Sequence, residues 1–183
     1  RVATLIVSDV PGDDPALVAS GPTVPIAGSR AEVRHLIALH GLELPAAAPA
    51  LLAGNENPPP RPDDPRFARN SVRIIASAAL SLDAAAAEAR RQGIAAHILS
   101  DAIEGEAREI GKSHAALAGE IKRRHAARDK PTVLLSGGET TVTLRGNGKG
   151  GRNTEFLLSF AVAIAGTEGI YGLAADTDGI DGS

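Results

Sequence analysis

A loop rich in aspartate at residues 176–181, Asp-Thr-Asp-Gly-Ile-Asp, is the first candidate for chemistry in this sequence. It follows an apolar stretch and carries three carboxylates, Asp176, Asp178 and Asp181. Carboxylates so close together repel one another unless water or a cation neutralises them. Mg²⁺ is bound through one or two carboxylates plus substrate oxygens, so the loop predicts a metal site at these three residues. Glycine stands fourth in the loop, which excludes the calcium loop of an EF-hand.

A second acidic loop, Ser-Asp-Val-Pro-Gly-Asp-Asp, occupies residues 8–14 after the apolar run 2–7. Asp9 and Asp13 are its candidate catalytic carboxylates. Asp14 directly precedes a proline, which favours a structural capping role for its side chain. An ordinary aspartate-rich turn is the alternative interpretation of this loop, and the sequence leaves it open.

Two glycine-rich stretches lie within residues 136–153. In the first, Ser-Gly-Gly-Glu-Thr, paired glycines let backbone N–H groups approach a ligand closely beside Glu139. In the second, Gly-Asn-Gly-Lys-Gly-Gly-Arg-Asn at 146–153, free N–H groups, the helix dipole and two cations converge where a helix should begin. A tight turn and a solvated connector are the respective alternatives. The residues expected to bind substrate or phosphate are Ser136, Gly137, Gly138, Lys149 and Asn153, with Arg152 as the anion-binding cation.

The elements that must position these loops alternate between strands and helices. A capping box from Ser29 to Glu32 starts a helix that Gly41 ends, and a shorter helix runs from Pro45 to about Gly54. We expect strands at 2–7, 72–76, 95–99, 132–135, 140–144 and 170–174, and further helices at 82–91, 106–124 and 153–165. The alternation over 72–135 predicts right-handed crossovers and a parallel sheet. Five prolines within 55–70 place a domain boundary there.

Composition excludes several functional classes. The chain has 183 residues, 43% of them hydrophobic, a net charge of −3 and scattered Lys and Arg, so nucleic acid and anionic membranes are not expected partners. No apolar run approaches the ~20 residues of a membrane span. Cysteine is absent, which excludes disulfides and thiolate chemistry in this chain. Methionine is absent too, so we expect the natural start to lie beyond this sequence, and the turn-like stretch 178–183 indicates the same for the natural end. With neither a membrane span nor a signal peptide visible, we expect a cytoplasmic enzyme.

Familiar nucleotide and metal motifs are missing. The glycines at 146–151 do not follow the dinucleotide fingerprint, and Gly111-Lys112-Ser113 lies inside a predicted helix with Gly105 misplaced for a P-loop. The five histidines show no metal-ligand spacing. His114 shares the inward stripe of the long helix with Ile110, so it faces the sheet or its edge, and we expect a structural role for it.

The stretches SDVPGDD, LLSGGETTVTLRGNGKGGRNTEF and GLAADTDGIDGS, taken together, resemble the class II glycerate 2-kinase family over nearly the whole chain. This resemblance implies an α/β fold, with 1–69 as the end of a Rossmann-like three-layer domain and 70–183 as the start of a MOFRL-type domain, both incomplete. It implies transfer of the ATP γ-phosphoryl group to the 2-hydroxyl of D-glycerate, with Mg²⁺, between the two domains.

The resemblance also implies which residues act. The family's active-site residues match Asp9 or Asp13, Glu139, Arg152 and Asp178. Some relatives carry the label hydroxypyruvate reductase, so an NAD(P)H-dependent reductase is an alternative, as is a sugar-acid binding module without catalysis. The family's lysine-bearing N-terminal region is absent from this sequence, so we expect the chain alone to be inactive. The sequence does not indicate the oligomeric state.

Overall fold

The computed structural model describes residues 1–54, 60–125, 131–177 and 179–182. The chain divides into two compact units, Arg1–Ser77 and Ala78–Ser183. Both contain helices and parallel strand pairs, so the predicted α/β class is confirmed. Among the described residues, no helix combines the length and apolar character that crossing a membrane requires.

The first unit is built on a parallel pair of strands, β1 (Ala3–Val7) and β2 (Ser71–Ala76). Between them lie η1 (Val18–Ser20), α1 (Arg30–His40), α2 (Ala48–Ala53) and η2 (Pro65–Phe67). The sequence predicted that the strand at 72–76 joins the same sheet as 95–99, and this is wrong. The strand at 72–76 is part of β2, which pairs with β1 at the start of the chain, in a register that is continuous from Ala3↔Ser71 to Ile6↔Ile74.

Helix α1 begins and ends as the sequence predicted. The Ser29 hydroxyl accepts a hydrogen bond from the Glu32 N–H at 3.2 Å, and the Ser29 N–H donates to the Glu32 carboxylate at 2.7 Å. The Ser29 N–H and the Ser29 hydroxyl both donate to the Glu32 carboxylate, and these two bonds lower the pKa of Glu32 below its ordinary value. Gly41 ends the helix with φ +59°, a left-handed conformation that favours glycine.

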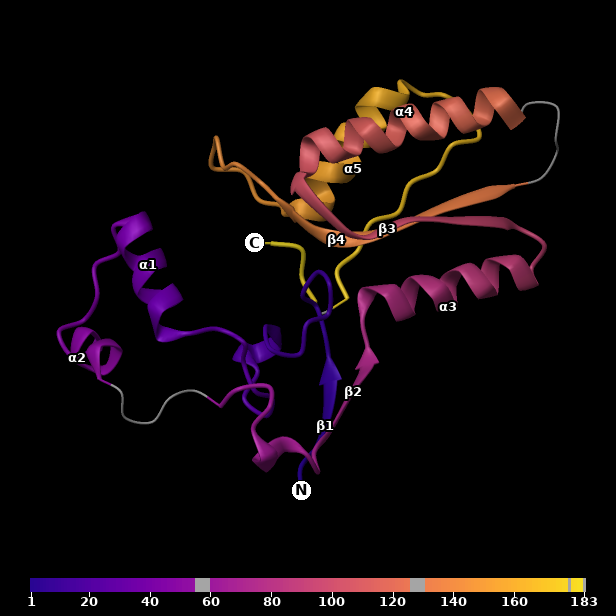
Figure 1. The fold of residues 1–183 in the computed structure, drawn as a ribbon. Coiled ribbons are helices and arrows are strands. Elements are labelled where there is room, and N and C mark those ends of the chain that lie inside the picture. The colour runs from indigo at the N-terminus through magenta and orange to yellow at the C-terminus, as the bar shows by residue number, and fades with distance from the viewer. Residues whose placement is uncertain (55–59, 126–130, 178, 183) are drawn as a thin grey trace. The chain divides into compact units, whose positions relative to one another are not determined.

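The second unit is a layered structure around the parallel pair β3 (Ala95–Glu106) and β4 (Thr132–Thr141). Helix α3 (Ala78–Arg91) lies on one face of the pair, and α4 (Ala107–His125) and α5 (Arg152–Ile164) lie together on the other (Figure 1). Both strands are longer than predicted, and β4 unites the stretch 132–135 with the start of 140–144. The strand expected at 170–174 is wrong. A strand requires ladder hydrogen bonds to a neighbouring strand, and this segment forms none with β4.

Helices α4 and α5 approach closely because a glycine lies at their contact. A Cβ atom on Gly111 would stand 2.5 Å from the Phe156 carbonyl oxygen. The Ser159 hydroxyl donates to the Arg108 carbonyl at 2.6 Å, and the Arg108 guanidinium lies 3.1 Å from Glu155. These contacts fix the start of α5 against the start of α4.

Candidate functional site

The Ser136–Gly138 stretch of β4 lies where the ladder with β3 is irregular. Ile98 pairs with Leu135 and Ile103 pairs with Gly138, so β3 bulges between them. The Ser100 hydroxyl accepts from the Ala102 N–H at 3.0 Å and supports this bulge. Gly138 has φ +146°, and a Cβ there would lie 2.1 Å from the Ile103 carbonyl oxygen. Only glycine therefore fits, and bulges of this kind re-aim side chains beside functional sites.

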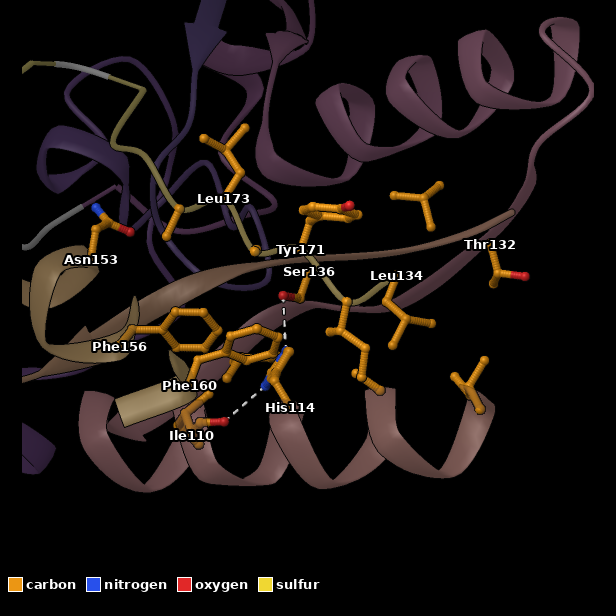
Figure 2. A pocket seen from close by; sticks show the side chains of 18 of the residues that line it. Ile110, His114, Thr132, Leu134, Ser136, Asn153, Phe156, Phe160, Tyr171 and Leu173 are labelled. Atoms are coloured by element: carbon orange, nitrogen blue, oxygen red, sulfur yellow. Dashed lines mark hydrogen bonds between the residues drawn. The ribbon is translucent and has the colours of Figure 1, made fainter. Parts of the chain in front are cut away.

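A hollow of about 1020 Å³ opens beside this irregular stretch, between β4, the facing helices α4 and α5, and the segment 169–174 (Figure 2). Four of the five predicted binding residues line it: Ser136, Gly137, Gly138 and Asn153. Its remaining walls are largely apolar. Tyr171 and Leu173, which border it, are 92% and 90% exposed. Lys149, the fifth predicted binding residue, is exposed and does not line the hollow in the described part of the chain.

His114 projects from α4 toward this hollow and contacts Ser136 (Figure 2). Its Nδ1 lies 2.9 Å from the Ile110 carbonyl oxygen, and its Nε2 lies 3.1 Å from Ser136 Oγ. The ring also meets Phe156 edge-to-face, with centroids 5.2 Å apart. The sequence placed His114 on the inward stripe but not at the site, because its partner lies 22 positions further along the chain on β4.

A charged cluster in the second unit joins β4, the first residue of α5 and the segment that follows residue 174. Arg152, the first residue of α5, forms ion pairs with Glu139 of β4 and with Asp176, whose Oδ1 lies 3.6 Å from the guanidinium. The side chains are 39%, 52% and 14% exposed in that order. The structure thus brings together residues that the sequence separated by 37 positions, from 139 to 176. A guanidinium has five donors, so two carboxylates do not exhaust its capacity to bind an anion.

The N-terminus of α5 is capped from within the chain. The Asp181 carboxylate accepts hydrogen bonds from the Asn153 N–H at 2.9 Å, the Thr154 N–H at 2.8 Å and the Thr154 hydroxyl at 2.6 Å. Burial raises the pKa of Asp181, but the bonds from Thr154 and Asn153 outweigh it, so the pKa lies below its ordinary value. The helix end that was predicted to bind a substrate anion therefore already holds a carboxylate.

The predicted metal residues do not form a metal site among the described residues. No group of three side chains suited to a metal ion is present in that part of the chain. Asp176 is paired with Arg152, and Asp181 is committed to α5. Asp178 lies outside the described residues, so its predicted catalytic and metal-binding roles stay predictions.

The acidic loop of the first unit has a strained backbone. Asp13 adopts φ +53°, which is unfavourable for a residue other than glycine, and its side chain is partly buried, whereas Asp9 is exposed. Asp14 Oδ1 accepts from the Ala16 N–H at 2.9 Å, which agrees with its predicted structural role. The catalytic role predicted for Asp9 or Asp13 stays a prediction.

Two known families match separate parts of the chain, and each part contains one group of the loops described above. Residues 132–183 match the MOFRL family, and residues 1–53 match a domain of unknown function, DUF4147. The MOFRL segment contains Glu139, Arg152 and Asp176, and the DUF4147 segment contains the first acidic loop. The resemblance drawn from the sequence motifs is therefore confirmed.

Curated relatives and a solved structure extend the MOFRL comparison along the whole chain. A putative hydroxypyruvate reductase of Agrobacterium vitis is 47% identical over all of this chain and 41% of its own length. A D-glycerate 2-kinase of Thermotoga maritima is 33% identical over all of this chain and 42% of its own length. The crystal structure of a glycerate kinase from Thermotoga maritima matches with a TM-score of 0.81, 32% identity, and coverage of 100% of this chain and 42% of that one. The chain thus spans less than half the length of these relatives.

Proposed function

We propose that the protein containing this chain is a glycerate 2-kinase, which transfers the γ-phosphoryl group of ATP to the 2-hydroxyl of D-glycerate and gives 2-phosphoglycerate. The observation that carries the proposal is the convergence of Glu139, Arg152 and Asp176 beside a hollow lined by Ser136–Gly138 and Asn153. The names of the relatives, D-glycerate 2-kinase and glycerate kinase, support it.

The cluster suits phosphoryl transfer, where positioning and charge neutralisation dominate over covalent chemistry. Arg152 would bind the glycerate carboxylate or a phosphate oxygen, and its planar fork suits both. The glycerate hydroxyl oxygen attacks the γ-phosphorus as the bond to the bridging oxygen breaks, and ADP leaves with that bonding pair. Glu139 would accept the hydroxyl proton, with Asp13 or Asp9 of the first loop as the alternative acceptor.

Mg²⁺ enters this proposal with ATP, as part of the nucleotide substrate. Asp176 and Asp181 already have protein partners, so the described residues do not fit a metal cage, and no step above depends on one. We further propose that residues 1–69 end a Rossmann-like domain and that the MOFRL-type domain lies within 70–183, beginning after β2, which pairs with β1 of the first unit. A cytoplasmic location, where ATP is available, follows from the same proposal.

A reductase is the second candidate, because the 47% identical relative bears the name putative hydroxypyruvate reductase. The absence of a dinucleotide fingerprint from this sequence counts against it. A binding module without catalysis is a third candidate, and it predicts glycerate binding without turnover.

One preparation of the natural full-length protein tests all three candidates. We expect ADP and 2-phosphoglycerate to form together only when D-glycerate and ATP are both present, as followed by ³¹P NMR, which separates the 2- and 3-phosphate isomers. NAD(P)H consumption with hydroxypyruvate is measured in parallel. Reduction without ADP formation would establish the reductase, and glycerate binding with neither reaction would establish the binding module.

A further inference from the structure

His114 and Ser136 form a pair whose hydrogen atoms can be assigned from their partners. A carbonyl oxygen only accepts hydrogen bonds, so the contact of 2.9 Å between Nδ1 and the Ile110 carbonyl places a proton on Nδ1. In the neutral ring Nε2 is then an acceptor. With the ring neutral, the contact of 3.1 Å between Nε2 and Ser136 Oγ is a bond that the serine hydroxyl donates.

This assignment decides what Ser136 offers to a ligand. A hydroxyl has one donor and two acceptor lone pairs, and the single donor is directed at His114. Ser136 lines the hollow, so Oγ presents acceptor lone pairs there (Figure 2). Lone pairs repel phosphate and carboxylate oxygens, whereas they accept hydrogen bonds from a ligand hydroxyl group.

The ring is held so that it cannot easily exchange these roles. The bond to the Ile110 carbonyl fixes one side of the imidazole, and Phe156 fixes the ring plane through an edge-to-face contact at 76°. On the sheet side, the bulge between Ile98 and Ile103 of β3 fixes the Ser136 backbone. Both halves of the pair therefore belong to rigid elements, which is the condition for a precise binding contact.

We propose that His114 is a positioning residue, which keeps Ser136 Oγ as an acceptor for the hydroxyl group of glycerate that does not react. This inference rests on the proposed kinase function and deepens it. The reacting 2-hydroxyl must give up its proton, which a carboxylate accepts far better than a serine oxygen does. The 3-hydroxyl keeps its proton and so suits the neutral Ser136 acceptor.

Kinetics of the natural full-length protein test the pair. His114→Phe keeps an aromatic ring against Phe156 and removes both hydrogen bonds, and Ser136→Ala removes the hydroxyl. Each should raise the KM for D-glycerate about tenfold, the effect of one lost hydrogen bond, with the KM for ATP and kcat nearly unchanged. The double variant should be no worse than either single variant, because the two side chains act as one unit.

Three comparisons separate positioning from a general structural role. Ser159→Ala removes a part-buried hydroxyl that is bonded to the Arg108 carbonyl and does not line the hollow, so it should leave both KM values unchanged. Ser136→Thr, which keeps the hydroxyl that Ser136→Ala removes, should have a KM for D-glycerate close to the wild-type value. With 2-hydroxypropionate as acceptor, which lacks the 3-hydroxyl, His114→Phe should have no effect. A parallel rise in the KM for ATP, additive single effects, or an unchanged defect with 2-hydroxypropionate would overturn the proposal.

A measurement that needs no turnover keeps this inference distinct from the kinase proposal. ¹⁵N NMR of the full-length protein with labelled histidine should show His114 as the neutral Nδ1–H tautomer, and Ser136→Ala should shift its Nε2 resonance. An Nε2–H tautomer would overturn the positioning role even in an active kinase. Absence of glycerate phosphorylation by the wild-type protein would instead overturn the proposed function.

Discussion

Replacement of Arg152 by alanine separates a catalytic role for this residue from a structural one. The guanidinium pairs with Glu139 and Asp176, and the three side chains are 39%, 52% and 14% exposed. Ion pairs exposed to this degree each contribute roughly 0.2–1 kcal/mol to stability, because water screens them. The alanine variant should therefore lose about 1–2 kcal/mol of unfolding free energy at most.

The expected loss of activity is much larger than the loss of stability. A guanidinium that contacts the transferring phosphoryl group or the glycerate carboxylate stabilises the transition state by about 3–4 kcal/mol, as preorganised donors at such sites do. This corresponds to a fall of about 10²–10³-fold in kcat/KM. The kcat/KM of Arg152→Lys should lie between those of the wild-type and Arg152→Ala proteins, because lysine keeps the charge and loses the bidentate fork.

The assay is ADP formation dependent on D-glycerate by the natural full-length protein, with urea unfolding measured on the same samples. Arg108→Ala is the matched control, because Arg108 lies 3.1 Å from Glu155 with both side chains about one third exposed, and neither residue lines the hollow. It should show a similar loss of stability with nearly normal activity. An Arg152→Ala protein within a few-fold of wild-type kcat/KM would refute the reasoning.

Three further predictions follow from close contacts in the second unit. Gly138→Ala would place a Cβ 2.1 Å from the Ile103 carbonyl at φ +146°, so it should cost about 3 kcal/mol or more in urea unfolding and abolish glycerate binding in calorimetry. Gly111→Ala, 2.5 Å from the Phe156 carbonyl, should cost about 1–3 kcal/mol, seen as a lower urea midpoint with an unchanged m-value. Asp181→Ala should cost about 1–2 kcal/mol at neutral pH as a lost helix cap. The native pKa of Asp181 is lowered from 3.8, so its contribution to stability is present above the unfolded pKa and is lost as pH falls through the native pKa. The unfolding free energies of the wild-type and Asp181→Ala proteins should therefore converge in acid. A difference between them that stays constant with pH would contradict this.

Local signals in the sequence were sufficient for several elements. The capping box at Ser29 and the terminal Gly41 fixed α1, because both act within one turn of the helix. The apolar stripe of α4 placed His114 on the inward face for the same reason. The convergence of Glu139 and Arg152 was accessible too, since each follows a glycine-rich turn at the end of a predicted strand.

Features set by partners far along the chain were beyond local reasoning. The pairing of β2 with β1 and the extension of β3 depend on ladder bonds to strands dozens of residues away. Asp181 was predicted to bind metal because its neighbours are acidic, yet its carboxylate is held by amides 27 and 28 positions earlier. Sequence spacing alone does not reveal whether such a carboxylate binds a metal ion or accepts hydrogen bonds from backbone amides.

The bulge in β3 also indicates where natural relatives can vary in length. From Ile98 to Ile103 β3 advances five positions while β4 advances three, from Leu135 to Gly138, so β3 carries two additional residues. They enter one at a time, because Ser100 pairs with Ser136 between the two shifts in register. A bulge absorbs an unpaired residue locally, and the strand beyond it keeps its pairing. Insertions and deletions between related sequences should therefore occur at these two points of β3 rather than within its regularly paired stretches.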